Sequence, residues 1–142
     1  MKDPSAIELQ KYASLEAAER IRRLAFEINR TAKRADEESI HDLRVSTRRL
    51  SQCLLVFDEL FPRHASKKAH KRMGKIMKST AEVRNRDIAI GLLKQSGVAG
   101  TGEVVETLAK ERKEAATALS AELKGLKEKE ISRRWTMRLK AG

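Results

Sequence analysis

Residues 39–61, SIHDLRVSTRRLSQCLLVFDELF, contain the pattern that decides the fold. Apolar side chains recur there at intervals of seven, four and three, at Leu43, Leu50, Leu54 and Phe57. These intervals align side chains on one face of an α-helix. Ser39 and Asp42 have the spacing of a capping box, so we expect the helix to begin at Ser39. Because Pro62 disfavours helical backbone before it, the helix is predicted to end near Phe61.

The same periodicity continues on both sides of this segment. It predicts a first helix that runs from an Asp3 cap with Pro4 at the first position to about Arg34, a third helix from shortly after Pro62 to about Gln95, and a fourth from Val104 to Leu126. Ile131, Trp135 and Leu139 either continue the fourth helix or form a short terminal one. Apolar and polar residues do not alternate over the length of a strand. The sequence therefore predicts an all-α fold, an antiparallel four-helix bundle with long helices.

Small residues add local detail to this fold. Gly74 and Gly91 interrupt the predicted third helix, and we expect them to mark close approach of a neighbouring helix. Cys53 lies within the apolar stripe of the second helix and is expected to be a small core residue. A chain of 142 residues is the size of a single domain, so we assign residues 1–142 to one.

The chain carries a formal net charge of +11, and most of it is concentrated in one segment. Residues 63–100 contain ten Lys and Arg against Glu82 and Asp87, a net charge of +8, whereas the rest of the chain carries +3. A basic segment of this kind indicates a polyanionic partner. The sequence shows no secretory signal, no apolar run long enough to span a bilayer and one cysteine, so we expect a cytoplasmic protein without a membrane partner.

Four basic residues of the second helix form the pattern H-x-x-R-V-x-x-R-R: His41, Arg44, Arg48 and Arg49. The first three share one helix face, with Arg49 at its shoulder, and we expect His41 in the first helical turn. A guanidinium holds two phosphate oxygens at once, which suits such a face to phosphate. The alternative is a solvated face neutralised by Asp42 or other neighbouring acids.

A second basic stripe follows the predicted third helix at Lys68, Lys71, Lys75 and Lys78, flanked by Lys67 and Arg72. It could be a solvated lysine face, or it could merge with the arginines of the second helix into one basic wall. Residues 84–87, RNRD, close this run. For Asp87 the structural alternative is an ion pair, with Arg84 or with a partner across the bundle.

Other chemistries lack their signatures. The histidines have no metal-ligand spacing, no Gly-rich loop follows a strand, and no nucleophile pairs with a base, so we expect neither enzymatic activity nor a cofactor. Residues 62–134 contain no Phe, Tyr or Trp, and binders of single-stranded nucleic acid commonly stack bases on aromatic side chains. A polyphosphate-like ligand is therefore favoured over nucleic acid, and non-specific nucleic-acid binding remains the alternative. Docking of a protein partner through the acidic residues 36–38 is a third possibility.

Two motifs resemble those of the CHAD family of histidine-bearing α-helical domains. Residues 40–50, IHDLRVSTRRL, look like its first signature, and residues 83–88, VRNRDI, look like its weaker second one. The resemblance covers residues 5–125 and implies a helical domain that binds inorganic polyphosphate, in some members at polyphosphate granules. Together with the charge pattern it predicts these binding residues: His41, Arg44, Arg48, Arg49, Lys68, Lys71, Arg72, Lys75, Lys78 and Arg84.

The chain departs from the family pattern in two respects. Asn85 stands where the second motif has an acidic residue, which leaves Asp87 as its carboxylate. Typical members contain two related four-helix units, whereas this sequence resembles one. We therefore expect a homodimer that rebuilds the basic surface from two copies.

Overall fold

The predicted all-α fold is confirmed in the computed structural model, which describes residues 4–126 and 130–142 and contains no strand within these ranges. The four long helices are α1 (Pro4–Lys33), α2 (Glu37–Val56), α3 (Arg63–Ser96) and α4 (Gly102–Lys124). A 3₁₀ turn (Asp58–Leu60) precedes α3, and a π-helical turn (Ile131–Trp135) leads into the short helix α6 (Thr136–Arg138). The expected cap Asp3 lies outside the described residues.

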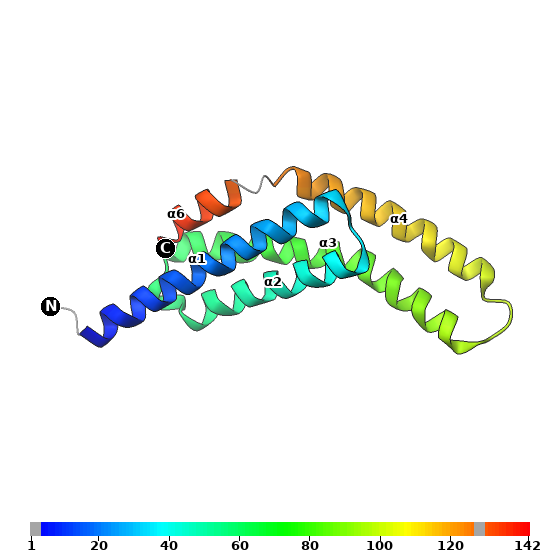
Figure 1. Ribbon diagram of the computed structural model, residues 1–142, viewed down its shortest axis with the longest axis horizontal. Coiled ribbons are helices and arrows are strands. Elements are labelled where there is room, and N and C mark those ends of the chain that lie inside the picture. The colour runs from blue at the N-terminus through cyan, green and yellow to red at the C-terminus, as the bar shows by residue number, and fades with distance from the viewer. Residues whose placement is uncertain (1–3, 127–129) are drawn as a thin grey trace.

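Consecutive helices run antiparallel to one another (Figure 1). Arg30 of α1 contacts Asp42 of α2, while Gln10, near the other end of α1, donates to the carbonyl oxygen of Leu60 beyond α2. Hydrogen bonds between α2 and α3, and between α3 and α4, follow the same antiparallel register. The C-terminal segment lies beside the beginning of α3 and packs against α1. This arrangement is compatible with the predicted four-helix unit.

The core lies where α1, α2, the first half of α3 and the end of α4 meet. Its largest fully buried side chains are Ile21, Leu24, Ile28, Ile40, Leu43, Leu50, Leu54, Met73, Ile76, Leu119, Leu123 and Leu139. Each such side chain contributes roughly 1.5–3 kcal/mol through removal of its surface from water. Cys53 is buried in this core, as expected, and burial raises the pKa of its thiol. The stripe predicted for the second helix therefore forms part of the core.

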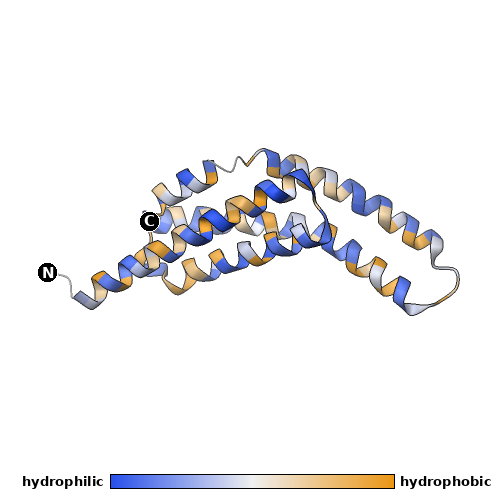
Figure 2. Cartoon of the chain, viewed as in Figure 1, coloured by the Kyte–Doolittle hydropathy of each residue, from blue (hydrophilic) through white to orange (hydrophobic). Residues whose placement is uncertain are grey.

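The second half of α3 and the first half of α4 project beyond the α1–α2 pair as a helical hairpin (Figure 1). None of residues 84–118, all of which the structure describes, is fully buried. Apolar residues nevertheless continue to the end of this hairpin (Figure 2). Four of them are largely exposed: Ile88, Leu92, Val98 and Val104. The core is thus confined to one end of the molecule, whereas exposed apolar side chains occur at both ends, among them Tyr12 and Val56 at the end that holds the core.

The boundaries of α2 differ from the prediction at both ends. The carboxylate of Asp36, and not the side chain of Ser39, caps the helix by accepting a 2.8 Å hydrogen bond from the Ser39 amide. This bond is the main cause of a lowered pKa for Asp36. The Ser39 hydroxyl instead donates to the carbonyl oxygen of Arg34. At the other end α2 stops at Val56, because a 3₁₀ turn intervenes before Pro62.

The expectation for the two glycines within α3 is wrong. A Cβ atom added at Gly74 or at Gly91 would have no neighbouring heavy atom within 4 Å, apart from the helix's own nearby backbone. Neither glycine therefore allows a second helix to approach closely. Nothing in the described residues explains why glycine occupies these two positions.

Candidate functional site

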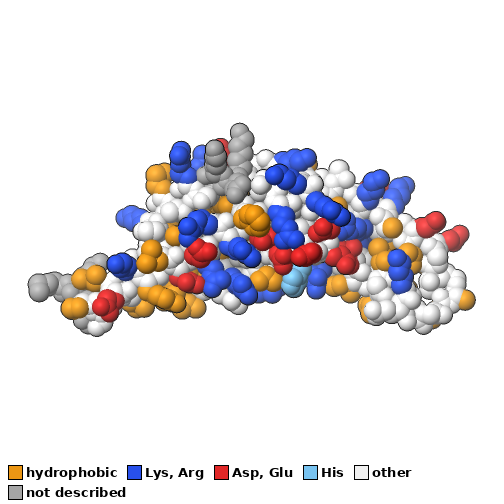
Figure 3. Space-filling view, in the orientation of Figure 1, with side chains coloured by type: hydrophobic (Ala, Val, Ile, Leu, Met, Phe, Trp, Pro, Cys, Tyr) orange, Lys and Arg blue, Asp and Glu red, His pale blue; other side chains and the backbone are white. Residues whose placement is uncertain are grey.

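Most arginines of the described chain that lie outside the α2–α3 face are neutralised by carboxylates. The paired arginines are Arg20, Arg22, Arg23, Arg30, Arg34, Arg86 and Arg112. Over the middle of the face drawn in Figure 3, acidic and basic side chains accordingly lie beside one another. The arginines predicted to bind phosphate form no ion pair with any described residue. Ion pairing therefore distinguishes the arginines whose charge a carboxylate already neutralises from the arginines predicted to bind phosphate.

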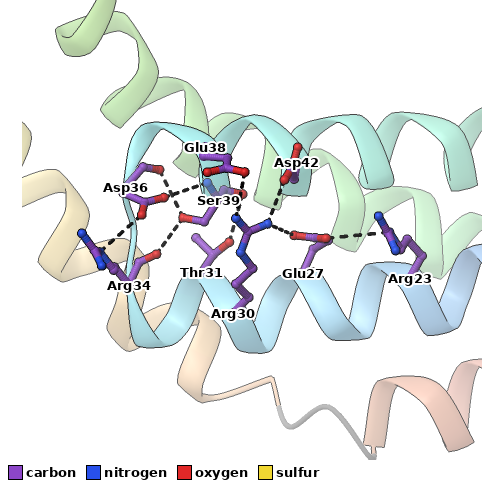
Figure 4. A network of polar contacts seen from close by, with 9 residues as sticks. All are labelled: Arg23, Glu27, Arg30, Thr31, Arg34, Asp36, Glu38, Ser39 and Asp42. Atoms are coloured by element: carbon purple, nitrogen blue, oxygen red, sulfur yellow. Dashed lines mark hydrogen bonds and ion pairs between the residues drawn. The ribbon is translucent and has the colours of Figure 1, made fainter.

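Asp42 illustrates this separation at the start of α2 (Figure 4). Its carboxylate accepts a 2.8 Å hydrogen bond from Arg30 of α1, and Arg30 also pairs with the buried Glu27. The bond to Asp42 is the main cause of a raised pKa for Arg30. Asp42 therefore faces α1 and does not serve as the counter-charge for Arg44, which is two residues further on and points to another side of α2. The alternative of a face neutralised by Asp42 is not supported.

Arg44 bridges α2 and α3. One terminal nitrogen of its guanidinium donates to the carbonyl oxygen of Met77 at 2.8 Å and to Oγ1 of Thr80 at 2.9 Å. Thr80 is fully buried, and its hydroxyl donates in turn to the carbonyl oxygen of Ile76. The half-buried Arg44 side chain is thereby held in one place at the junction of the two helices.

The surroundings of Arg44 are unusually positive. Burial lowers the pKa of its guanidinium most, and the charges of Arg84 and Arg48 lower it further. Arg44 nonetheless remains cationic at neutral pH, because arginine loses its proton only far above that range. Arg48 and Arg84 are exposed side chains on α2 and α3. Three like charges thus meet at this junction, an arrangement that an anion would stabilise.

His41 and Arg49 are less closely tied to this cluster. Both are exposed on α2, where His41 lies one turn before Arg44. Since α2 begins at Glu37, His41 is in its second turn, and the expectation of a place among the free amides of the first turn is wrong. Arg49 lies about 140° around the helix from Arg44, at roughly 100° per residue. It therefore stands to one side of the cluster.

The lysines of α3 extend the positive charge away from the cluster. Lys71, Lys75 and Lys78 are exposed and form no ion pair with a described residue. By the advance of about 100° per residue, they cover the solvent side of α3. We call these three lysines, together with Arg44, Arg48 and Arg84, the basic belt. By the same advance, the lysines lie about 120–180° around α3 from Arg84, so the belt consists of the cluster at the α2–α3 junction and of separate lysines on the outer surface of α3.

Lys68 and Arg72 occupy a different place from the one expected. Both line a hollow between the beginning of α3 and the C-terminal segment, together with Arg134 and Arg138. Along α3, Arg72 lies about 18 Å before Arg84, at a rise of about 1.5 Å per residue. The two predicted stripes therefore do not form one uniform wall. Lys68 and Arg72 lie apart from the arginine cluster, near the beginning of α3.

The second motif divides its charges between structure and surface. Asp87 accepts a 2.9 Å hydrogen bond from Nε of Arg112 on α4, so its ion pair is the one predicted across the bundle. Arg112 also donates to the carbonyl oxygen of Ala35 in the α1–α2 connection. Arg86 pairs with two glutamates. Arg84 alone among the charges of this motif is left for a ligand, and Asn85 is exposed.

Sequence reasoning missed the role of two groups of residues. The sequence prediction of the site does not include Thr80, although a hydroxyl within the apolar stripe of α3 indicates a hydrogen-bonding role. Arg134 and Arg138 meet Lys68 only through the fold, and no local pattern places them there. No three His, Cys, Asp or Glu side chains of the described ranges form a metal-binding cluster, and none of the described helices could cross a membrane.

Comparison with known proteins gives one match. The model of the family described as CHAD domain matches residues 16–142, which is most of the chain. No curated protein and no solved structure matches the chain.

Asp87→Ala is expected to lower the free energy of unfolding by about 1–3 kcal/mol, because Arg112 would keep a half-buried charge without its carboxylate. Glu82→Ala is the matched control, since it also removes one carboxylate of α3 but breaks an exposed pair with Arg86. That control should cost less than about 1 kcal/mol. Urea unfolding measures both, and equal losses would contradict a structural role for Asp87.

Proposed function

The chain belongs to the CHAD family, whose domains are associated with polyphosphate binding, and we propose that it binds inorganic polyphosphate through the basic belt of α2 and α3. The observation that carries this proposal is the cluster of Arg44, Arg48 and Arg84. The charges of Arg48 and Arg84 act unfavourably on the charge of Arg44, and none of the three arginines forms an ion pair with a described carboxylate. A flexible polyanion would neutralise all three at once.

Arg44 gives the belt a fixed point. Its guanidinium spends one nitrogen on Met77 and Thr80, which leaves the remaining donors of its fork for phosphate oxygens. Because the side chain is already ordered, binding a phosphate there costs little conformational entropy. A half-buried guanidinium also interacts more strongly with an anion than a fully solvated one, since water screens it less. We infer that Arg44 positions the first phosphates of the chain.

The exposed lysines of the belt provide contacts along the length of a polyphosphate chain. Lys71 and Lys78 are about 10 Å apart along α3, at roughly 1.5 Å per residue, so they suit successive groups of an extended chain. Lysine contributes a mobile point charge and imposes little geometry. We therefore propose that the arginines fix the position of polyphosphate and that the lysines add affinity along it. His41 and Arg49 would extend the same surface along α2.

Polyphosphate is favoured over nucleic acid because the belt provides positive charge but no side chains that would recognise bases. Its members are Arg and Lys, and α3 carries no aromatic side chain on which a base could stack. Guanidinium and ammonium groups hold phosphate oxygens but supply no nucleophile, so we propose binding without catalysis. A cytoplasmic location, in some cells at polyphosphate granules, stays a prediction.

Replacing Arg48 and Arg84 together with Gln is expected to weaken polyphosphate binding at least about tenfold, since each side chain is exposed and gives up a charge-assisted contact. The slope of log affinity against log salt should also decrease in magnitude by roughly one to two. Isothermal titration with polyphosphate of defined length, repeated at several salt concentrations, measures both quantities.

The matched control is the double variant Arg22→Gln and Arg23→Gln on α1. It also removes two positive charges, but from side chains that are both 66% exposed and already paired with glutamates. Its affinity should stay within about twofold of the unaltered protein. If the control loses as much affinity as the belt variant, net charge alone explains binding and the site assignment is wrong.

We further propose that a second copy of the chain covers the exposed end of the α3–α4 hairpin. Ile88, Leu92, Val98 and Val104 are 46–62% exposed there, and no residue of that hairpin between 84 and 118 is fully buried. Uncovered apolar groups gathered on one element favour association. A second copy would bring its own basic belt close to the first and would extend the surface available to one polyphosphate chain.

Light scattering is expected to give the mass of a dimer, and Leu92→Glu is expected to shift that mass toward the monomer. A charge at Leu92 would have to be desolvated on association. Val56→Glu is the control, because Val56 is 74% exposed at the opposite end of the molecule. A monomer both with and without polyphosphate would refute the dimer while leaving the belt intact.

A further inference from the structure

A hollow of about 700 Å³ lies between the beginning of α3 and the C-terminal segment. Its apolar lining includes Ala65 and Ala69 of α3, Leu126 after α4, and Ile131 and Trp135 of the π-helical turn. Ala69 and Ile131 are buried, whereas Ala65, Leu126 and Trp135 are half-buried. A space of this volume with an apolar floor is typical of sites for small organic molecules.

The rim of the same hollow is strongly basic. Among the described residues, its charged lining consists of Lys68, Arg72, Arg134 and Arg138 against one acid, Glu130, and His64 also lines it. The four cations are exposed, and none forms an ion pair with another described residue. Two of them come from α3 and two from the C-terminal segment, so the rim surrounds the floor from opposite sides. The arrangement favours an anionic head above an apolar body.

The hollow differs from the basic belt in its position and also in its chemistry, because it has an apolar floor. The belt consists of cations on helix surfaces, whereas the hollow combines cations with Trp135. An inorganic phosphate chain has no group that would gain from contact with the indole ring or with Leu126. A ligand that uses both parts of the site therefore carries an organic body.

We propose that this hollow is a binding site for small organic phosphates, with the phosphate held by the cations of the rim and the organic body packed against Trp135. The inference does not depend on polyphosphate binding at the belt. It assigns Lys68 and Arg72 to a second site and gives Arg134 and Arg138 the task of closing it around the ligand's head.

Trp135 is the only tryptophan of the chain, so its fluorescence reports directly on this site. Two pairs of probes distinguish the contribution of the organic body to binding from that of the phosphate. ATP is compared with tripolyphosphate, and decyl phosphate below its micelle concentration is compared with inorganic phosphate. At least one organic probe is expected to change the fluorescence and to bind at least about tenfold more tightly than its inorganic match. The pair that differs identifies whether the body is aromatic or alkyl.

Two variants test the assignment of residues. Ala65→Phe fills the hollow, and Arg134→Ala removes a rim cation; each is expected to weaken binding of the organic probe at least about tenfold. Arg133→Ala is the matched control, since this neighbouring exposed arginine does not line the hollow and should leave affinity within about twofold. Thermal melting of each variant shows whether it remains folded. The double variant Arg48→Gln and Arg84→Gln should bind the probe normally, which distinguishes the hollow from the belt.

The proposal is overturned if neither organic probe binds more tightly than its inorganic match. It is also overturned if Arg133→Ala weakens binding as much as Arg134→Ala does in folded protein, because the interaction would then be with overall charge. Normal binding by folded Ala65→Phe would place the organic body elsewhere and contradict the site in the same way.

Discussion

The hydrogen bonds of Arg44 to α3 are the interaction on which the candidate site depends. They join the α2 surface to the carbonyl oxygen of Met77 and to the hydroxyl of Thr80, and they fix which residues of α3 lie opposite α2. In that register Arg84 is near enough to act on the charge of Arg44. A guanidinium that packs two helices together is thus also the centre of the positive cluster. The packing of α2 against α3 and the proposed binding surface therefore share one side chain.

The acids of the chain complete this arrangement by their placement. Asp42 turns toward Arg30 on α1, and Asp87 turns toward Arg112 on α4, although both carboxylates belong to the motifs that carry the basic residues. Each motif therefore contributes its carboxylate to packing and leaves at least one exposed arginine without an ion pair to a described residue, Arg48 and Arg49 in the first motif and Arg84 in the second. A site assembled in this way repels itself without a ligand, and the stability of the surrounding helix pairs has to offset that repulsion.

Sequence periodicity was sufficient for the helices and for the α2 face, since both follow from contacts between residues three and four apart. It failed where the deciding partner is distant or has a competitor nearby. Asp36 caps α2 in place of Ser39, whose own amide donates to the Asp36 carboxylate, and Gly74 faces open space that no local pattern reports. The separation of Lys68 from the belt required the C-terminal segment, whose place beside α3 is known only from the folded chain.

Side-chain NMR of the arginine Nε–H groups during titration with polyphosphate tests the central claim most directly. Arg44, Arg48 and Arg84 are predicted to shift together at low ligand concentration. Arg30 and Arg112, which carboxylates already hold, are predicted to stay in place. Shifts of Arg30 and Arg112 that match or exceed those of the three cluster arginines would contradict the account, because the ligand would then be attracted by net charge and not by the unpaired cluster.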